Sequence, residues 1–200
     1  MKKRARPKRE QIIQAAFEVI CSRGYYETRI DDIARRARVA KGTVYLYFPD
    51  KPAIYLGIIR WLISQAVGVV SETDRQSVAP AVKLTRIYRT WIEKLQSYPG
   101  TVDLLFPEIN RERCNLGRQF REQLLPELHR LLDSVARIVR QGIIARQFRP
   151  VDTRLAALNF LNAFRSGLLV NSGHLKIKAL PEQALELFLY GVAYKPKGGK

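Results

Sequence analysis

Apolar residues recur along this chain mainly every three or four positions, the spacing that gathers them on one face of an α-helix. Alternating polar and apolar runs, which are typical of strands, are scarce. A first helix is expected over residues 8–23, with Gly24 just beyond its end, where glycine is the usual residue. The pattern predicts an all-α fold of about nine helices.

Residues that typically cap or interrupt helices place most of the other helices. Asp50 is expected to cap a fourth helix, Asp152 or Thr153 an eighth, and Pro126 is expected to kink or break a seventh. After the short helices of residues 28–48, the expected helices run from 51 to 71–75, from 80 to about 97, over 102–106, over 110–146, from 153 to about 171 and from 181 to about 194.

Domain organisation follows from where the short helices are. Three helices around one small apolar cluster predict a self-contained head at residues 1–50. Residues 51–194 are then expected to form a larger helical body, and residues 195–200 are expected to be disordered. The apolar content of 46% is ample for a buried core.

The segment 28–48 carries the most informative pattern. It predicts two short helices joined by a tight turn at Val39–Ala40, with Thr28 as the N-cap of the first. Val44, Tyr45 and Phe48 are expected to supply the inward contacts of the second helix. This is the build of a helix-turn-helix, which places its second helix in the DNA major groove.

The same segment resembles the N-terminal signature of the TetR family of bacterial transcriptional regulators. The resemblance covers about residues 8–57, with matching positions at fixed spacing and no gap. One departure is that the family often has histidine where this chain has Tyr47, which can still donate a hydrogen bond to a phosphate. The residues that carry the resemblance are Gly24, Tyr25, Thr28, Ile33, Ala34, Ala37, Val39, Gly42, Thr43, Tyr45, Tyr47, Phe48 and Lys51.

DNA contacts are expected along and around the second helix of this motif. Lys41 and Thr43 lie in its first turns, where side chains reach base edges. Tyr45 is expected either to pack inside the head or to reach the DNA backbone. The resemblance implies phosphate contacts for Tyr47 and Lys51. The full expected set is Arg29, Lys41, Gly42, Thr43, Tyr45, Tyr47 and Lys51.

The charge of the chain supports a polyanionic partner. The net charge of +17 fits nucleic acid, an anionic membrane or an acidic ligand. Residues 1–60 carry 14 basic and 6 acidic side chains, a denser positive charge than the longer remainder carries. Six of the first nine residues are Lys or Arg, which predicts either a DNA-binding arm or a disordered solubilising tail. A generally arginine-rich composition is the alternative reason for the basic body.

The body offers two sets of candidate residues. Inward aromatic residues, together with a basic one, either line a ligand cavity or simply form core; they are Trp61, Tyr88, Trp91, Phe106, Arg113 and Phe120. The resemblance implies that the last two helices pair with those of a second subunit in a four-helix bundle, although the same residues also suit an intramolecular core. The dimer candidates are Ala156, Phe160, Phe164, Gly167, Leu187 and Phe188.

The leading hypothesis is a cytoplasmic homodimeric repressor that binds a palindromic DNA operator and is released by a small hydrophobic or amphipathic effector. The alternative is a DNA-binding protein without small-molecule input, either architectural or switched by a partner.

No catalytic motif, cofactor motif or metal-ligand spacing is present, so an enzyme is not expected. Cys21 and Cys114 suit buried positions better than a redox pair. The chain contains no uncharged apolar stretch of 18 residues, so no transmembrane helix is expected.

Overall fold

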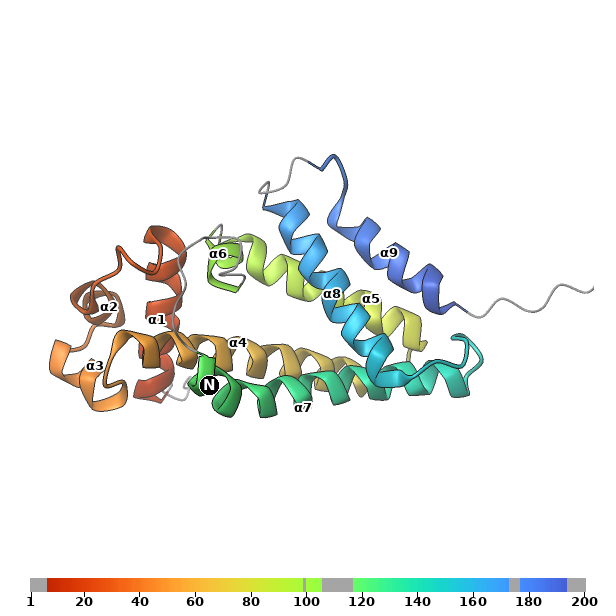
Figure 1. The fold of residues 1–200 in the computed structure, drawn as a ribbon, viewed down its shortest axis with the longest axis horizontal. Helices are drawn as coiled ribbons and strands as arrows, with labels where there is room; N and C mark the ends of the chain where they lie inside the picture. The colour runs from red at the N-terminus through yellow and green to blue at the C-terminus, as the bar shows by residue number, and fades with distance from the viewer. Residues whose placement is uncertain (1–6, 99, 106–116, 173–176, 194–200) are drawn as a thin grey trace, which may run out of the picture. The chain divides into compact units, whose positions relative to one another are not determined.

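The structure, a computed structural model, describes residues 7–98, 100–105, 117–172 and 177–193. Within these ranges the regular elements are helices, apart from one isolated antiparallel bridge between Phe148 and Ala193. The all-α prediction is therefore confirmed. The helices are α1 Lys8–Arg23, α2 Ile30–Ala37, α3 Lys41–Tyr47, α4 Lys51–Asp74, α5 Pro80–Gln96, α6 Thr101–Leu105, α7 Gly117–Ile144, α8 Thr153–Asn171 and α9 Pro181–Val192 (Figure 1).

The chain divides into two compact units. The head unit consists of Met1–Leu62 and Tyr98–Leu125, and the body unit of Ile63–Ser97 and Pro126–Lys200. The chain passes between the units at three places: two lie inside the long helices α4 and α7, and the third, between Ser97 and Tyr98, follows the end of α5. The division at residue 50, where the short helices give way to long ones, stays a prediction about domains. In the structure, the first half of α4 belongs to the head unit.

The head unit is built around a small core shared by its first three helices. Ile12, Ile13 and Phe17 of α1 are buried, as are Ile33 of α2 and Val44 of α3. In Figure 1, α1, α2 and α3 form one group, coloured red to orange. Their short lengths mean that α2 and α3 depend on this packing, because isolated helices of fewer than about 12 residues are marginal in water.

Local signals at the ends of these helices are partly as expected. Gly24 ends α1 with a φ of 88° and donates its N–H to Ile20 O, a conformation that favours glycine. Asp50 caps α4 by accepting a hydrogen bond from the Ala53 N–H at 2.7 Å. Both predictions are confirmed.

The prediction that Thr28 is the N-cap of α2 is wrong. The hydroxyl of Thr28 is buried and donates to Gly24 O at 2.7 Å, so it holds the loop that follows α1. The helix begins two residues later, at Ile30, and the Asp32 carboxylate accepts a hydrogen bond from the Arg29 N–H at 3.2 Å. The capping group therefore comes from inside the helix, which the order of residues alone does not reveal.

Pro126 does not end the seventh helix, because α7 runs through it from Gly117 to Ile144. The division between the head and body units falls at that residue. The expected start of this helix near residue 110 lies outside the described residues, as do the basic arm at residues 1–6, the tail at residues 195–200 and Cys114.

Helix α4 is long and apolar enough to cross a membrane, by length and composition alone. Arg60 interrupts its apolar run, which is why the sequence predicts no transmembrane helix. Half of this stretch is buried in the structure, as in the core helix of a globular protein. Ile54 and Ile58 of α4 are fully buried in the head unit, so packing within the chain accounts for this buried part of the stretch.

The body unit has an aromatic core between α5, α8 and α9. Tyr88 and Trp91 of α5 contact Phe160 and Phe164 of α8 with ring centroids 5.2–6.4 Å apart. Phe188 of α9 packs on Phe160 at 5.5 Å. Edge-on aromatic pairs of this kind add stability beyond the area they bury. In Figure 1, α8 and α9 lie side by side.

A buried ionic cluster joins α4, α5 and α7 within the body unit. The Lys83 ammonium donates to Asp74 Oδ1 at 3.1 Å, to Asp74 O at 2.6 Å and to Gln141 Oε1 at 3.1 Å. Gln141 donates in turn to Asp74 Oδ1 at 2.9 Å. Lys83 is only 6% exposed, so its charge depends on these acceptors.

Candidate nucleic-acid interface

The helices α2 and α3 meet through a turn of three residues. Arg38 has a φ of 52°, and its N–H reaches the carbonyls of Ala34 and Arg35 at the end of α2. The Val39 N–H donates to Ala34 O at 3.0 Å, so the last carbonyls of α2 are satisfied. After Ala40, α3 begins at Lys41. This is the helix-turn-helix predicted from residues 28–48.

Helix α3 has a buried side and an exposed side. Val44 is fully buried, and Phe48, the next residue after the helix, is 2% exposed. Tyr45 is 46% exposed and Tyr47 42% exposed, so both side chains are accessible to a partner. The expectation that Tyr45 packs inside the head is wrong, while its alternative, a contact with the DNA backbone, stays a prediction. Thr43 is half-buried.

Lys41 is held by an ion pair on the exposed surface. Its ammonium lies 2.9 Å from Asp31 Oδ2, and both side chains are about half exposed. The hydrogen bond with Asp31, followed by the charge of that carboxylate, raises the pKa of Lys41 above its ordinary value. Asp31 therefore positions the first side chain of α3, a role that its placement at a helix start does not reveal.

Lys51, at the start of α4, is also engaged within the head. Its ammonium donates to Tyr26 O at 3.0 Å and lies 4.6 Å from the centroid of the Tyr25 ring. The carbonyl and the ring fix this cation next to the loop that precedes α2. Arg9 is placed in a similar way, 5.0 Å above the ring of Phe48.

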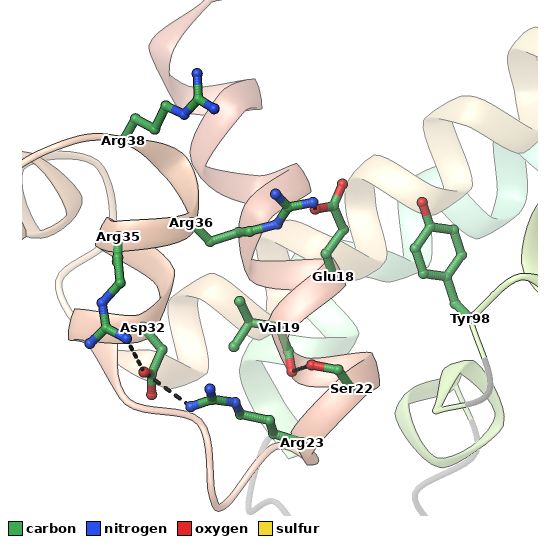
Figure 2. Close-up of a pocket in the computed structure, with 9 residues that line it drawn as sticks. All are labelled: Glu18, Val19, Ser22, Arg23, Asp32, Arg35, Arg36, Arg38 and Tyr98. Atoms are coloured by element: carbon green, nitrogen blue, oxygen red, sulfur yellow. Dashed lines mark hydrogen bonds and ion pairs between the residues drawn. The ribbon is translucent and has the colours of Figure 1, made fainter.

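A hollow of about 640 Å³ lies beside α1 and α2 on the head unit. Figure 2 shows that Arg23 and Arg35 converge on Asp32, whereas Arg36 turns to Glu18. These ion pairs join α1 to α2 and account for most of the charges that line the hollow. The lining residues are Glu18, Val19, Ser22, Arg23, Asp32, Arg35, Arg36, Arg38 and Tyr98.

The expected DNA-contacting residues are thus brought to one region of the head unit. Arg29, Lys41 and Gly42 are exposed, as are both tyrosines of α3, and Lys51 is partly exposed. In the part of the chain that the structure describes, no group of three or more His, Cys, Asp or Glu residues lies close enough to hold a metal ion. Cationic and aromatic groups, rather than metal ligands, define this surface.

The ligand-pocket candidates divide into described and undescribed residues. Tyr88 is fully buried and donates to Pro181 O, and burial, followed by the charge of Glu182, raises the pKa of its phenol. The indole nitrogens of Trp61 and Trp91 are buried without a hydrogen-bond partner among the described residues. Phe106 and Arg113 lie outside the described residues, and the side chain of Phe120 is likewise not described.

Most of the dimer candidates face the inside of the single chain. Ala156, Phe160 and Phe188 are buried in the body unit. Gly167 lies against the hydroxyl of Tyr88, with no room for a Cβ atom, so its small size serves packing within the chain. Phe164 is half-buried on the rings of α5, whereas Leu187 is 76% exposed. Helical spacing could not separate these two environments.

Comparison with known proteins agrees with the geometry of the head. The family model for bacterial regulatory proteins of the tetR family matches residues 12–58. The fatty acid metabolism regulator protein of Bacillus subtilis (strain 168) is 27% identical over 197 residues, which cover 96% of this chain and 100% of that protein. The HTH-type transcriptional regulator RutR of Escherichia coli (strain K12) is 25% identical over 145 residues, covering 72% of this chain and 66% of RutR.

Solved structures share the fold of nearly the whole chain. The transcriptional regulator FadR from Bacillus subtilis, in complex with stearoyl-CoA, has a TM-score of 0.72 at 24% identity and covers 92% of this chain and 98% of its own. The fatty acid degradation regulator FadR from Bacillus halodurans has a TM-score of 0.73 at 22% identity, covering 94% and 97%. With its matching motif, fold and relatives, this chain belongs to the TetR family and is a DNA-binding transcriptional regulator, not an enzyme.

Proposed function

We propose that this protein is a homodimeric repressor that binds a palindromic operator and leaves it when a long-chain acyl thioester binds within residues 51–194. The observation that carries the DNA half of the proposal is the exposed side of α3, with Lys41 and two tyrosines around it. A regulator of this kind acts in the cytoplasm, where bacterial DNA is.

Dimerisation is supported by exposed apolar side chains on the last two helices. Leu155 and Leu158 of α8 are 58% and 48% exposed, and Leu187 and Tyr190 of α9 are 76% and 74% exposed. A hollow of about 510 Å³ is lined by residues from both helices. Clustered exposed apolar residues mark interaction surfaces. A second copy of the same two helices would cover them, and a two-fold dimer reads two half-sites.

The effector class is supported by two observations. The Bacillus subtilis FadR structure contains stearoyl-CoA, and this chain covers 98% of that one with the same fold. In addition, the Trp91 N–H is buried beside an aromatic cluster without an acceptor among the described residues. An unsatisfied buried donor costs roughly 1–3 kcal/mol, and a ligand carbonyl would satisfy it. Trp61, Phe106, Arg113 and Phe120 stay candidate pocket residues.

The effector is tested by measuring DNA affinity with and without stearoyl-CoA. Fluorescence anisotropy with bound genomic fragments should show an affinity about 5- to 150-fold lower in stearoyl-CoA, the range of typical allosteric coupling. Coenzyme A alone and stearate alone are the controls for the two halves of the molecule. Unchanged affinity with every acyl chain length would contradict the effector and favour the regulator without small-molecule input.

The dimer is tested with Leu187→Lys, which puts a charge on the exposed side of α9. Sedimentation should show a dimer for the unmodified protein and a monomer for this variant, with operator affinity at least about 100-fold lower because one of two half-sites is lost. Ile144→Lys is the matched control, since Ile144 is equally exposed, at 76%, but lies at the end of α7. A variant that stays dimeric would contradict this interface.

A further inference from the structure

The outermost ridge of α3 consists of two residues, Gly42 and Leu46. Each lies two positions from Val44, which is fully buried. Two positions correspond to about 200° around an α-helix, so both residues are on the side opposite the core. They are also four positions apart, which makes them neighbours along one ridge. A duplex that meets α3 on its exposed side therefore meets this ridge.

Leu46 is the most exposed of the large apolar side chains in the described residues, at 84%. Its neighbours in sequence, Tyr45 and Tyr47, lie about 100° to either side of it around the helix, and each keeps about half of its surface covered. Exposing a single leucine is common in proteins and needs no explanation by itself. Leu46 differs in its position, because it lies between two tyrosines in the last turn of the helix that is expected to read DNA.

Gly42 supplies an independent observation about the same ridge. A Cβ atom built at Gly42 would meet nothing within 4 Å, and its φ is not positive. Neither packing nor backbone conformation in the head therefore explains why a glycine stands there, although glycine in a helix lowers stability by about 1 kcal/mol relative to alanine. The missing side chain leaves room for an external group to approach the backbone of α3, directly beside Leu46.

The chemistry of the major groove identifies what Leu46 contacts. Polar base edges present hydrogen-bond donors and acceptors, to which leucine offers nothing, whereas thymine alone presents a methyl group there. We propose that Leu46 is a specificity-determining residue that packs on the C5-methyl group of a thymine in each half-site, with Gly42 allowing the close approach. This inference rests on the DNA-binding function, extends the contact set beyond the residues assigned above, and names one base feature that it reads.

The test replaces each thymine of a bound operator duplex by uracil, one at a time, which removes only the C5-methyl group. Affinities are measured for the unmodified protein and for Leu46→Ala. This substitution leaves folding intact because the position is exposed and alanine is the strongest helix former. For the unmodified protein, one thymine per half-site should lose about three- to fivefold in affinity as uracil, the value of one buried methyl group.

The Leu46→Ala variant should bind the thymine operator about that much more weakly and should not distinguish thymine from uracil at that position. Ile144→Ala, which truncates another exposed aliphatic side chain, should keep the full thymine preference. Equal thymine preferences in Leu46→Ala and the unmodified protein, or no thymine whose methyl group affects affinity, would overturn the assignment. Either result leaves operator binding itself measurable, so failure of this inference is distinct from failure of the proposed function.

Discussion

The two units of the chain use the same chemical pair, a carboxylate with a cation, in opposite environments. In the head unit, Asp31 holds Lys41 on the surface, where both side chains are about half exposed. In the body unit, Asp74 holds Lys83, of which only 8% of the side chain is exposed. The first cation can exchange its carboxylate for a phosphate or a base, whereas the second is enclosed.

This difference teaches that exposure, more than the number of charges, separates DNA-binding cations from structural ones. A surface ion pair contributes little to stability and is easily replaced, because water solvates both partners. A buried pair contributes little net stability either, but removing one partner leaves an uncompensated charge and is strongly destabilising. Substitutions in the two units should therefore affect different measurements.

The largest effect is expected for Lys83→Met in the body unit. The substitution leaves Asp74 without its main cation, which should lower the free energy of unfolding by about 3–5 kcal/mol. Denaturant unfolding followed by circular dichroism measures it. Lys94→Met on the same helix α5 is the control, because Lys94 is exposed and should change stability by less than about 0.5 kcal/mol. Similar values for both variants would erase the contrast between the units.

The buried cluster also predicts a pH dependence. Burial alone would raise the pKa of Asp74, but hydrogen bonds from Gln141 and Lys83, with the charges of Lys83 and Arg137, lower it below its ordinary value. The Asp74 carboxylate therefore binds a proton more weakly in the folded state than in the unfolded state. Its contribution to stability is present above the ordinary aspartate pKa, about 4, and is lost as pH falls through the lowered value.

Acid unfolding curves of the unmodified protein and of Asp74→Asn check this prediction. The unmodified protein should lose part of its stability below about pH 4, and the variant should lack that part of the acid dependence. If the two proteins lost stability identically at low pH, Asp74 would have the same pKa in the folded and unfolded states.

A smaller effect is expected for Lys41→Gln in the head unit, and it should appear in DNA binding only. Operator affinity should fall about tenfold, as for the loss of one good base contact, while the unfolding free energy stays unchanged. Anisotropy titrations and denaturant unfolding of the same preparation provide both values. A loss of stability without a loss of affinity would assign Lys41 a structural role, like that of Lys83.

The smallest effect is expected for Asp31→Asn, and its sign is opposite. Removing the carboxylate releases Lys41 and removes a negative charge next to the DNA, so affinity should rise about two- to fivefold at low salt. Raising the salt concentration should shrink the difference, because both terms are screened. A decrease in affinity would show that Asp31 is needed to orient Lys41 on the DNA.

Most helices could be predicted from the sequence because their signals are local. Helical spacing gave the faces, and Gly24, Asp50 and Asp152 marked ends that the structure confirms; Asp152 accepts a hydrogen bond from the Leu155 N–H at 2.7 Å. The prediction for Thr28 failed because its hydroxyl donates to Gly24 O, earlier in the chain. In the sequence, a threonine that does this cannot be distinguished from one that caps the following helix.

The site was harder to predict wherever a residue depends on contacts far along the chain. Tyr45 lies next to a buried valine, and its spacing alone suits both sides of α3. The partner of Lys41 is ten residues away on another helix, and Lys83 meets Gln141 across 58 residues. Phe160 and Leu187 share an apolar character, and only the packed structure tells the buried one from the exposed one.

The central claim is that the exposed side of α3 recognises a DNA sequence as part of a two-fold dimer. Selection of genomic fragments by the purified protein, followed by sequencing, tests it most directly, with Lys41→Gln as the comparison. We expect enrichment of one two-fold symmetric sequence, with half-sites one helical turn or a multiple of it apart, and loss of that enrichment in the variant. Retention of fragments without a shared sequence, sensitive only to salt, would contradict the claim.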